Sequence, residues 1–142
     1  MKQLMLMLLL CTAIGADAQR YQADDVTGTW LTGDKSGQIH IYKNGSKYYG
    51  RIAGGNKKTN KEHFDVHNPD PARRKDSLMG LVLLKNFEYD EDGKWTSGTI
   101  YDPKSGKTYS CNMSLSDKNT LRIRGYIGIS LLGRTEVWTR LR

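Results

Sequence analysis

Cysteine and histidine are scarce in this sequence of 142 residues, which contains two cysteines and three histidines. Cys11 lies in the apolar N-terminal segment, so only Cys111 remains for the domain that follows and no internal disulfide can form there. We expect Cys111 to be a small buried hydrophobic residue rather than a reactive thiol. No G-x-S-x-G motif is present, and few histidines are available as general bases. The sequence therefore predicts no catalytic residue, and an enzymatic role is the weaker hypothesis.

Long apolar runs are also absent beyond the first residues. Lys2 precedes an apolar run from Leu4 to Leu10, and Ala16-Asp17-Ala18 is a typical cleavage site. This pattern predicts a signal peptide over residues 1–18 and an exported protein, periplasmic or secreted. We expect residues 19–142 to form one domain with no transmembrane segment. Lipidation of Cys11 is not expected, because the residue before it is a bulky leucine.

Acidic residues are outnumbered, and the formal net charge is +7. A basic surface can attract envelope polymers or acidic lipid head groups, although evenly spread basic residues also simply keep a protein soluble. Nucleic acid is not an expected partner, because no aromatic-plus-basic nucleic-acid motif is present and the protein is predicted to be exported.

Alternating apolar and polar residues are abundant. Tyr109, Cys111, Met113 and Leu115 share one face of a predicted strand. That strand forms a hairpin over 95–115 whose turn, 102–106, contains aspartate, proline and glycine. Asn44-Gly45 predicts a second tight hairpin. Further strands are expected at 28–31, 38–43, 48–53, 78–89, 121–127 and 136–142.

This pattern predicts an all-β domain with eight or nine strands joined mostly by short turns. Closing the sheet removes its unpaired edges, so we expect an antiparallel up-and-down β-barrel. Residues 54–76 form a long polar loop, with a short helix expected at 71–75. If the faces of the last two strands match, Arg122, Arg124, Trp138 and Arg140 form one cluster, with Glu136 as the nearby carboxylate.

Two resemblances follow from these residues. Gly28-x-Trp30 on the first strand and Arg140 on the last resemble the lipocalin-like barrels, in which the tryptophan lies near the closed end and the arginine packs across it. We therefore expect Trp30, Trp138 and Arg140 to close the barrel.

A second resemblance covers nearly all of the chain after residue 18 and depends on an ordered set of short motifs. These are Gly28-x-Trp30, Tyr49-Gly50-Arg51-Ile52, Asp65 with Asn68-Pro69-Asp70, Gly80-Leu81, Gly98-x-Ile100-Tyr101-Asp102-Pro103, Gly106-Lys107-x-Tyr109, Leu121-x-Ile123-Arg124-Gly125-Tyr126, Leu132-Gly133-Arg134 and Trp138-Thr139-Arg140. Together they resemble DUF2147, an uncharacterised family of exported bacterial proteins. The resemblance implies a small lipocalin-like barrel and brings no activity or ligand with it.

Candidate binding residues are tyrosines, arginines and loop amides that could surround an apolar body with an anionic head. They are Tyr49, Arg51, Asn68, Asp70, Tyr101, Tyr109, Arg124 and Tyr126. For the tyrosines ordinary sheet packing is the alternative, and for Asn68 and Asp70 it is a structural turn. His63, Asp65 and His67 could hold zinc if extended, but solvated side chains are the simpler interpretation, and no metal or cofactor is predicted.

Three functions remain open. The first is a binding module for a small amphipathic or anionic ligand in the cell envelope. The second is a structural or interaction protein with a filled barrel, and the third is an envelope-polymer hydrolase. Interior side-chain size does not decide between the first two. The small residues Gly50, Gly80, Gly98 and Gly125 leave space, whereas Met113, Leu121 and Ile123 occupy it.

Overall fold

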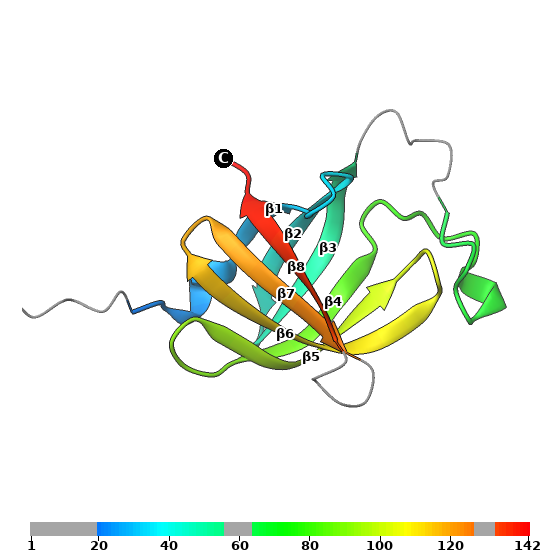
Figure 1. Cartoon of the computed structure of the whole chain (residues 1–142). Coiled ribbons are helices and arrows are strands. Elements are labelled where there is room, and N and C mark those ends of the chain that lie inside the picture. Colours follow the sequence, from blue (N-terminus) through cyan, green and yellow to red (C-terminus); the bar gives the residue numbers. More distant parts are fainter. Residues whose placement is uncertain (1–19, 56–63, 127–132) are drawn as a thin grey trace, which may run out of the picture.

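Eight antiparallel strands close into one barrel in the computed structural model of the chain (Figure 1). The structure describes residues 20–55, 64–126 and 133–142. The strands are β1 (Gly28–Leu31), β2 (Gly37–Asn44), β3 (Lys47–Gly55), β4 (Val82–Tyr89), β5 (Lys94–Asp102), β6 (Lys107–Asp117), β7 (Thr120–Tyr126) and β8 (Arg134–Arg140). Each strand pairs with the next, and β8 returns to β1 with Arg140 opposite Trp30. The predicted up-and-down barrel is confirmed.

The predicted signal peptide, residues 1–18, lies outside the described residues and stays a prediction. Within the described part of the chain, no helix is long and apolar enough to cross a membrane.

Local turn chemistry produces the tight hairpins. Gly45 has a φ of +65° between β2 and β3, and Gly106 has a φ of +71° between β5 and β6, a region that glycine enters without steric cost. The Asp102 carboxylate accepts the Lys104 backbone N–H at 3.0 Å, which holds the second turn. The turn glycines and the Asp102 side chain act within a few residues of each other, so the sequence alone is enough to predict these turns. Both predicted hairpins agree with the structure.

The apolar run before β4 is the exception, because the prediction that it starts a strand at Leu78 is wrong. β4 starts at Val82, and Gly80 adopts a φ of +84° in the turn before it. The turn is tied to β3, since the Gly80 N–H donates to the Ile52 carbonyl at 2.8 Å and the Ile52 N–H donates to the Leu81 carbonyl at 2.9 Å.

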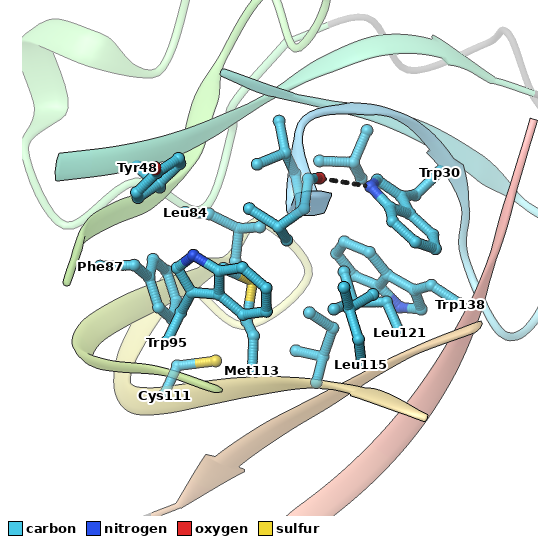
Figure 2. Packing of buried hydrophobic residues seen from close by; sticks show 14 of the residues in the cluster. Trp30, Tyr48, Leu84, Phe87, Trp95, Cys111, Met113, Leu115, Leu121 and Trp138 are labelled. Carbon is cyan, nitrogen blue, oxygen red and sulfur yellow. Dashed lines mark hydrogen bonds between the residues drawn. The ribbon is translucent and has the colours of Figure 1, made fainter. Parts of the chain in front are cut away.

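The end of the barrel near β1 is filled by large side chains. Trp30, Trp95, Phe87 and Leu84 are fully buried there, where Figure 2 shows them packed together. The strands of a closed barrel alternate interior and exterior residues, and the interior ones fill this end. The short 3-10 helix η1 (Ala23–Val26) covers it.

Hydrogen bonds fix η1 to the strands below it. The Trp30 Nε1–H donates to the Val26 carbonyl at 2.9 Å, which Figure 2 shows as a dashed line. The Trp95 Nε1–H donates to the Ala23 carbonyl at 3.1 Å, and the Tyr48 hydroxyl donates to the Asp24 carboxylate at 2.5 Å. Burial and the bond to Asp24 raise the pKa of Tyr48, so this hydroxyl stays protonated and remains a donor.

Arg140 completes the closed end. Its guanidinium lies 4.3 Å from the centre of the Trp30 ring. It donates to the carbonyls of Thr27 at 2.7 Å, Asp25 at 2.5 Å and Lys118 at 2.8 Å. One side chain therefore ties β8 to the η1 segment and to the β6–β7 turn.

The register between β7 and β8 shows that the predicted arginine cluster is wrong. Leu121 lies opposite Trp138, and Arg122 lies opposite Val137. Residues directly opposite each other share a face, so Trp138 points inward with the fully buried Leu121, whereas Arg122 is exposed on the outside. The inward set of β8 is the more polar one, which a pattern based on hydrophobicity assigns to solvent.

Glycines inside the barrel make room for larger neighbours. A Cβ atom on Gly98 would lie 2.4 Å from the Phe87 ring, and one on Gly50 would lie 2.7 Å from a methyl carbon of Leu84. At these two positions the space is therefore filled. Cys111 is 1% exposed, as expected, and burial raises the pKa of its thiol to about 12, which makes it unreactive at neutral pH.

Candidate ligand-binding cavity

A cavity of about 650 Å³ occupies the half of the barrel away from η1. This volume lies within the range of sites for small organic ligands. Its walls contain apolar side chains from six of the strands, which are Ile39, Ile52, Leu83, Ile100, Ile123 and Trp138. The barrel is therefore filled at one end and hollow at the other.

Charged residues of both signs surround the cavity mouth, which we define by Thr32, Asp34, Met79, Lys104 and Arg134. These residues come from the β1–β2 turn, the segment before β4, the β5–β6 turn and the start of β8. Met79 is 58% exposed, so the rim offers apolar as well as charged surface.

The β1–β2 turn at the mouth is stabilised through Asp34. Its carboxylate accepts hydrogen bonds from the Ser36 hydroxyl at 2.7 Å, the Ser36 backbone N–H at 3.0 Å and the Thr32 hydroxyl at 2.8 Å. The two bonds from Ser36 and the one from Thr32 lower the pKa of Asp34 to about 2. Asp34 is therefore a charged turn residue at neutral pH and a poor proton donor.

Polar groups interrupt the apolar wall. Tyr101, Tyr109, Tyr126, Glu136 and Trp138 all line the cavity. The Tyr126 hydroxyl accepts a long bond from the Asn112 amide at 3.4 Å. Glu136 forms none of the ion pairs found among the described residues.

Residues 64–81, which we call the tethered loop, lie against the cavity side of the barrel and contribute Leu78 and Met79 to the cavity. Asp65 is 1% exposed and accepts the Tyr101 hydroxyl at 2.6 Å. Burial, together with this bond, raises the pKa of Tyr101 to about 12. The pair joins the tethered loop to β5.

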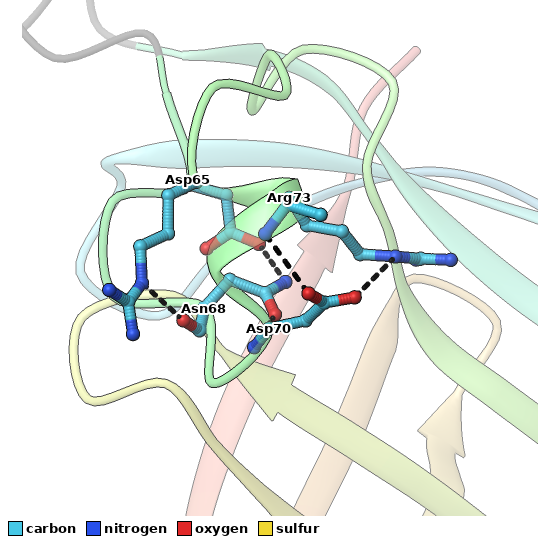
Figure 3. Close-up of polar contacts among 6 residues, drawn as sticks. Asp65, Asn68, Asp70 and Arg73 are labelled. Atoms are coloured by element: carbon cyan, nitrogen blue, oxygen red, sulfur yellow. Dashed lines mark hydrogen bonds and ion pairs between the residues drawn. The ribbon is translucent and has the colours of Figure 1, made fainter.

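Inside the tethered loop, polar side chains satisfy one another (Figure 3). The Asn68 amide donates to the Asp65 carboxylate at 2.8 Å, and its oxygen accepts the Asp70 N–H at 2.9 Å. Asp70 in turn caps the 3-10 helix η3 (Pro71–Arg73) by accepting the Ala72 N–H at 3.0 Å. The short helix predicted at 71–75 is present as this 3-10 helix, which ends at Arg73.

Gly106 explains why the tethered loop can approach the β5–β6 turn so closely. A Cβ atom at this position would lie 1.9 Å from the His67 carbonyl oxygen. Only glycine fits at this contact, so the turn residue at 106 serves both the hairpin and the loop that lies over it.

The predicted binding residues fall into three groups. Tyr101, Tyr109 and Tyr126 line the cavity, whereas Asn68 and Asp70 hold the tethered loop and are not among the lining residues. The third group, Tyr49, Arg51 and Arg124, lies on the outer face.

The contacts of the third group show this placement. The Tyr49 hydroxyl donates to the Asn86 side chain at 2.9 Å, and the Arg124 guanidinium donates to the Thr135 hydroxyl at 2.9 Å. Arg51 is exposed.

Sequence reasoning missed Glu136 and Trp138 as cavity residues. Glu136 lies opposite Ile123, and Trp138 opposite Leu121, so both belong to the inner face. The signal that could have identified them is the strict alternation of β8 combined with the buried side chains predicted on β7.

The described residues contain no group of three metal-binding side chains. His63 lies outside the described residues. His67 is exposed, and the Asp65 carboxylate is already bound by Tyr101 and Asn68.

Comparisons with known proteins agree with this fold. The model of a family described as "Uncharacterized protein conserved in bacteria (DUF2147)" matches residues 28–140. Among solved structures, the chain is similar to protein HP1028 of Helicobacter pylori, described as belonging to the lipocalin family. The two share 24% identity over 82% of each chain, with a TM-score of 0.75. This likeness shows the fold. No curated protein matches.

Proposed function

This chain belongs to DUF2147, a family of uncharacterized proteins conserved in bacteria, and we propose that it binds a small amphipathic ligand in the cell envelope. The binding site is the cavity in the open half of the lipocalin-like barrel. The protein would be an exported carrier or sensor of that ligand, because its first residues have the pattern of a signal peptide.

The cavity is the observation on which this proposal depends. Well-packed protein interiors leave few voids larger than a water molecule. The cavity in this barrel has a volume of about 650 Å³ and connects to solvent at one end. Keeping such a space costs packing energy, which bound ligand restores.

The chemistry of the walls favours an amphipathic ligand. Ile39, Ile52 and Ile100 would contact a hydrocarbon or ring body. Lys104 and Arg134 at the mouth would attract an anionic group. An apolar body placed inside with a polar head at the mouth therefore satisfies both regions.

The two alternatives have less support. A filled barrel that acts only through its surface describes the half near η1 and leaves the cavity without a role. A hydrolase would need a pair of groups with separated acid and base roles. Among the described residues that line the cavity, the carboxylates of Asp34 and Asp102 accept hydrogen bonds within their own turns, which leaves Glu136 as the carboxylate outside a turn.

Native mass spectrometry tests the proposal directly. We would purify the protein gently from its own envelope fraction and compare its mass under native and denaturing conditions. The proposal predicts a reproducible extra mass that is lost on denaturation. Bare protein across several growth conditions would favour the interaction protein instead.

A further inference from the structure

The indole N–H groups of the three tryptophans have different environments. Those of Trp30 and Trp95 donate to the carbonyls of Val26 and Ala23 in η1. Trp138 is 2% exposed, and its Nε1 has no hydrogen-bond partner among the described residues. Because nearly all buried polar groups are hydrogen-bonded, an orphaned donor of this kind needs an explanation.

The position of Trp138 supplies one. It lies at the boundary between the filled end and the cavity, paired with Leu121 and among the residues that line the cavity. Figure 2 shows its ring on the same side of the core as Trp30 and Leu121. The residue that carries the orphaned donor is thus part of the wall of the proposed binding site.

We propose that the ligand provides the missing acceptor: the inner end of the ligand carries an uncharged hydrogen-bond acceptor, such as a ketone, ester or amide oxygen, that binds the Trp138 indole N–H. This inference rests on the proposed function and narrows its ligand class. The rest of the ligand is apolar, to match the isoleucines and Leu83 on the surrounding walls.

Glu136 is the reason that the inner acceptor is uncharged. It also lines the cavity, two residues before Trp138 on the same face of β8, which places the two Cα atoms roughly 7 Å apart. A carboxylate head next to Trp138 would be repelled by this side chain. The cationic residues of the cavity lining, Lys104 and Arg134, lie at the mouth, where they would retain an acidic head.

The Nε1 atom of Trp138 is covered by its neighbours, so contact with a ligand requires a small turn of the ring. The indole N–H resonance of Trp138 is consequently a sensitive reporter of this contact. The resonances of Trp30 and Trp95 are internal references, since their hydrogen bonds to η1 do not involve the cavity.

The test uses three probes of matched length: nonane, 2-nonanone and nonanoate. Each is titrated into the wild-type protein and into Trp138→Phe, which removes the N–H and retains an aromatic ring. Trp95→Phe is the matched control, because it removes an indole N–H that lies outside the cavity lining. Comparing each probe across the variants cancels the different hydration of the probes.

We expect Trp138→Phe to weaken 2-nonanone binding about 3- to 10-fold, the usual effect of one hydrogen bond, and to leave nonane binding unchanged. Trp95→Phe should change the affinity for neither 2-nonanone nor nonane. In the wild type, 2-nonanone should shift only the Trp138 indole resonance. Nonanoate should bind without shifting that resonance and with no dependence on Trp138→Phe.

Three other binding results would contradict the hydrogen bond to Trp138, the uncharged acceptor or the binding site itself. If nonane and 2-nonanone both bind and Trp138→Phe weakens neither, the assigned hydrogen bond is wrong and the proposed function stands. If nonanoate shifts the Trp138 resonance and is weakened by Trp138→Phe, the restriction to an uncharged acceptor is wrong. If no probe binds the wild type, both the proposed function and this inference are overturned.

Discussion

Replacing Arg140 with methionine should destabilise the barrel strongly, because this side chain holds the closed end together. Arg140 donates to the carbonyls of Thr27 and Asp25 in partly buried surroundings and to the carbonyl of Lys118 at an exposed position. It also lies 4.3 Å from the centre of the Trp30 ring. Burial lowers the pKa of its guanidinium, which is consistent with a charge partly withdrawn from water.

The magnitude follows from these contacts. A hydrogen bond from a charged group contributes about 1.5–3 kcal/mol, and the exposed one contributes less. Stacking over the indole adds about 0.5–2 kcal/mol. Because water replaces part of what is lost, we expect Arg140→Met to reduce the free energy of unfolding by about 3–5 kcal/mol.

Urea unfolding monitored by tryptophan fluorescence would measure this change. Arg140→Lys should recover only part of the loss, since an ammonium cannot reproduce the planar, forked geometry of the guanidinium. Arg122→Met, on the exposed outer face, is the matched control and should stay within about 0.5 kcal/mol of the wild type. A loss below about 1 kcal/mol for Arg140→Met would refute this description of the closed end.

Three further predictions concern the interior, the tethered loop and the mouth. Gly98→Ala should cost about 1–3 kcal/mol in urea unfolding, because its Cβ would overlap the Phe87 ring. Tyr101→Phe should cost about 1–3 kcal/mol and increase proteolysis within the tethered loop, because the Oδ1 atom of the buried Asp65 carboxylate loses its donor while Asn68 still donates to Oδ2. The pKa of Asp34 is lowered from 3.8 to about 2 in the folded state. Its contribution to stability is therefore complete above about pH 4 and is lost as the pH falls towards 2, and Asp34→Asn should remove this part of the pH dependence of the urea midpoint.

Each of these three variants has its own control or contradicting result. Gly125→Ala should be tolerated, since the nearest atom to its Cβ would be 3.4 Å away, and equal losses at Gly98 and Gly125 would argue against the packing account. Unchanged proteolysis of Tyr101→Phe would mean that other contacts hold the loop. If Asp34→Asn keeps the acid transition of the wild type between pH 4 and 2, the hydrogen bonds of the turn do not control it.

Much of the barrel could be predicted from the sequence because its determinants are local. The hairpin formed by β5 and β6 combines a period of two in side-chain burial with a turn built from Asp102 and Gly106. Both signals act within a few residues of each other, and the structure agrees with them. The prediction of a strand from Leu78 was wrong because residues 78–81 form a turn, in which Gly80 has a φ of +84° and the Leu81 N–H donates to the Leu78 carbonyl at 3.0 Å.

The faces of β8 could not be predicted by hydrophobicity. Glu136, Trp138 and Arg140 point inward although two of them are charged, because Glu136 lines a solvent-connected cavity and Arg140 binds carbonyls across the closed end. A pattern that equates the interior with apolar residues fails wherever the interior is hollow or polar.

The cavity itself depends on pairs of residues that are distant in the sequence. Gly98 and Gly125 look alike as small interior residues, yet Phe87 occupies the space beside Gly98 while Gly125 borders the cavity. Which glycine leaves a void is decided by the neighbouring strand. For this reason the outward position of Arg124 follows from the alternation of β7, whereas the position of the cavity does not follow from the sequence.

Filling the cavity tests the central claim most directly. Gly125→Phe places a ring in the cavity, and Val137→Phe adds the same ring on the outer face of the adjacent strand, where Val137 is 46% exposed. Both variants and the wild type would be titrated with the fluorescent apolar probe N-phenyl-1-naphthylamine. A ligand-binding cavity predicts saturable binding of one equivalent to the wild type and Val137→Phe, and at least about tenfold weaker binding to Gly125→Phe. Equal binding by all three proteins, or no saturable binding by the wild type, would contradict it.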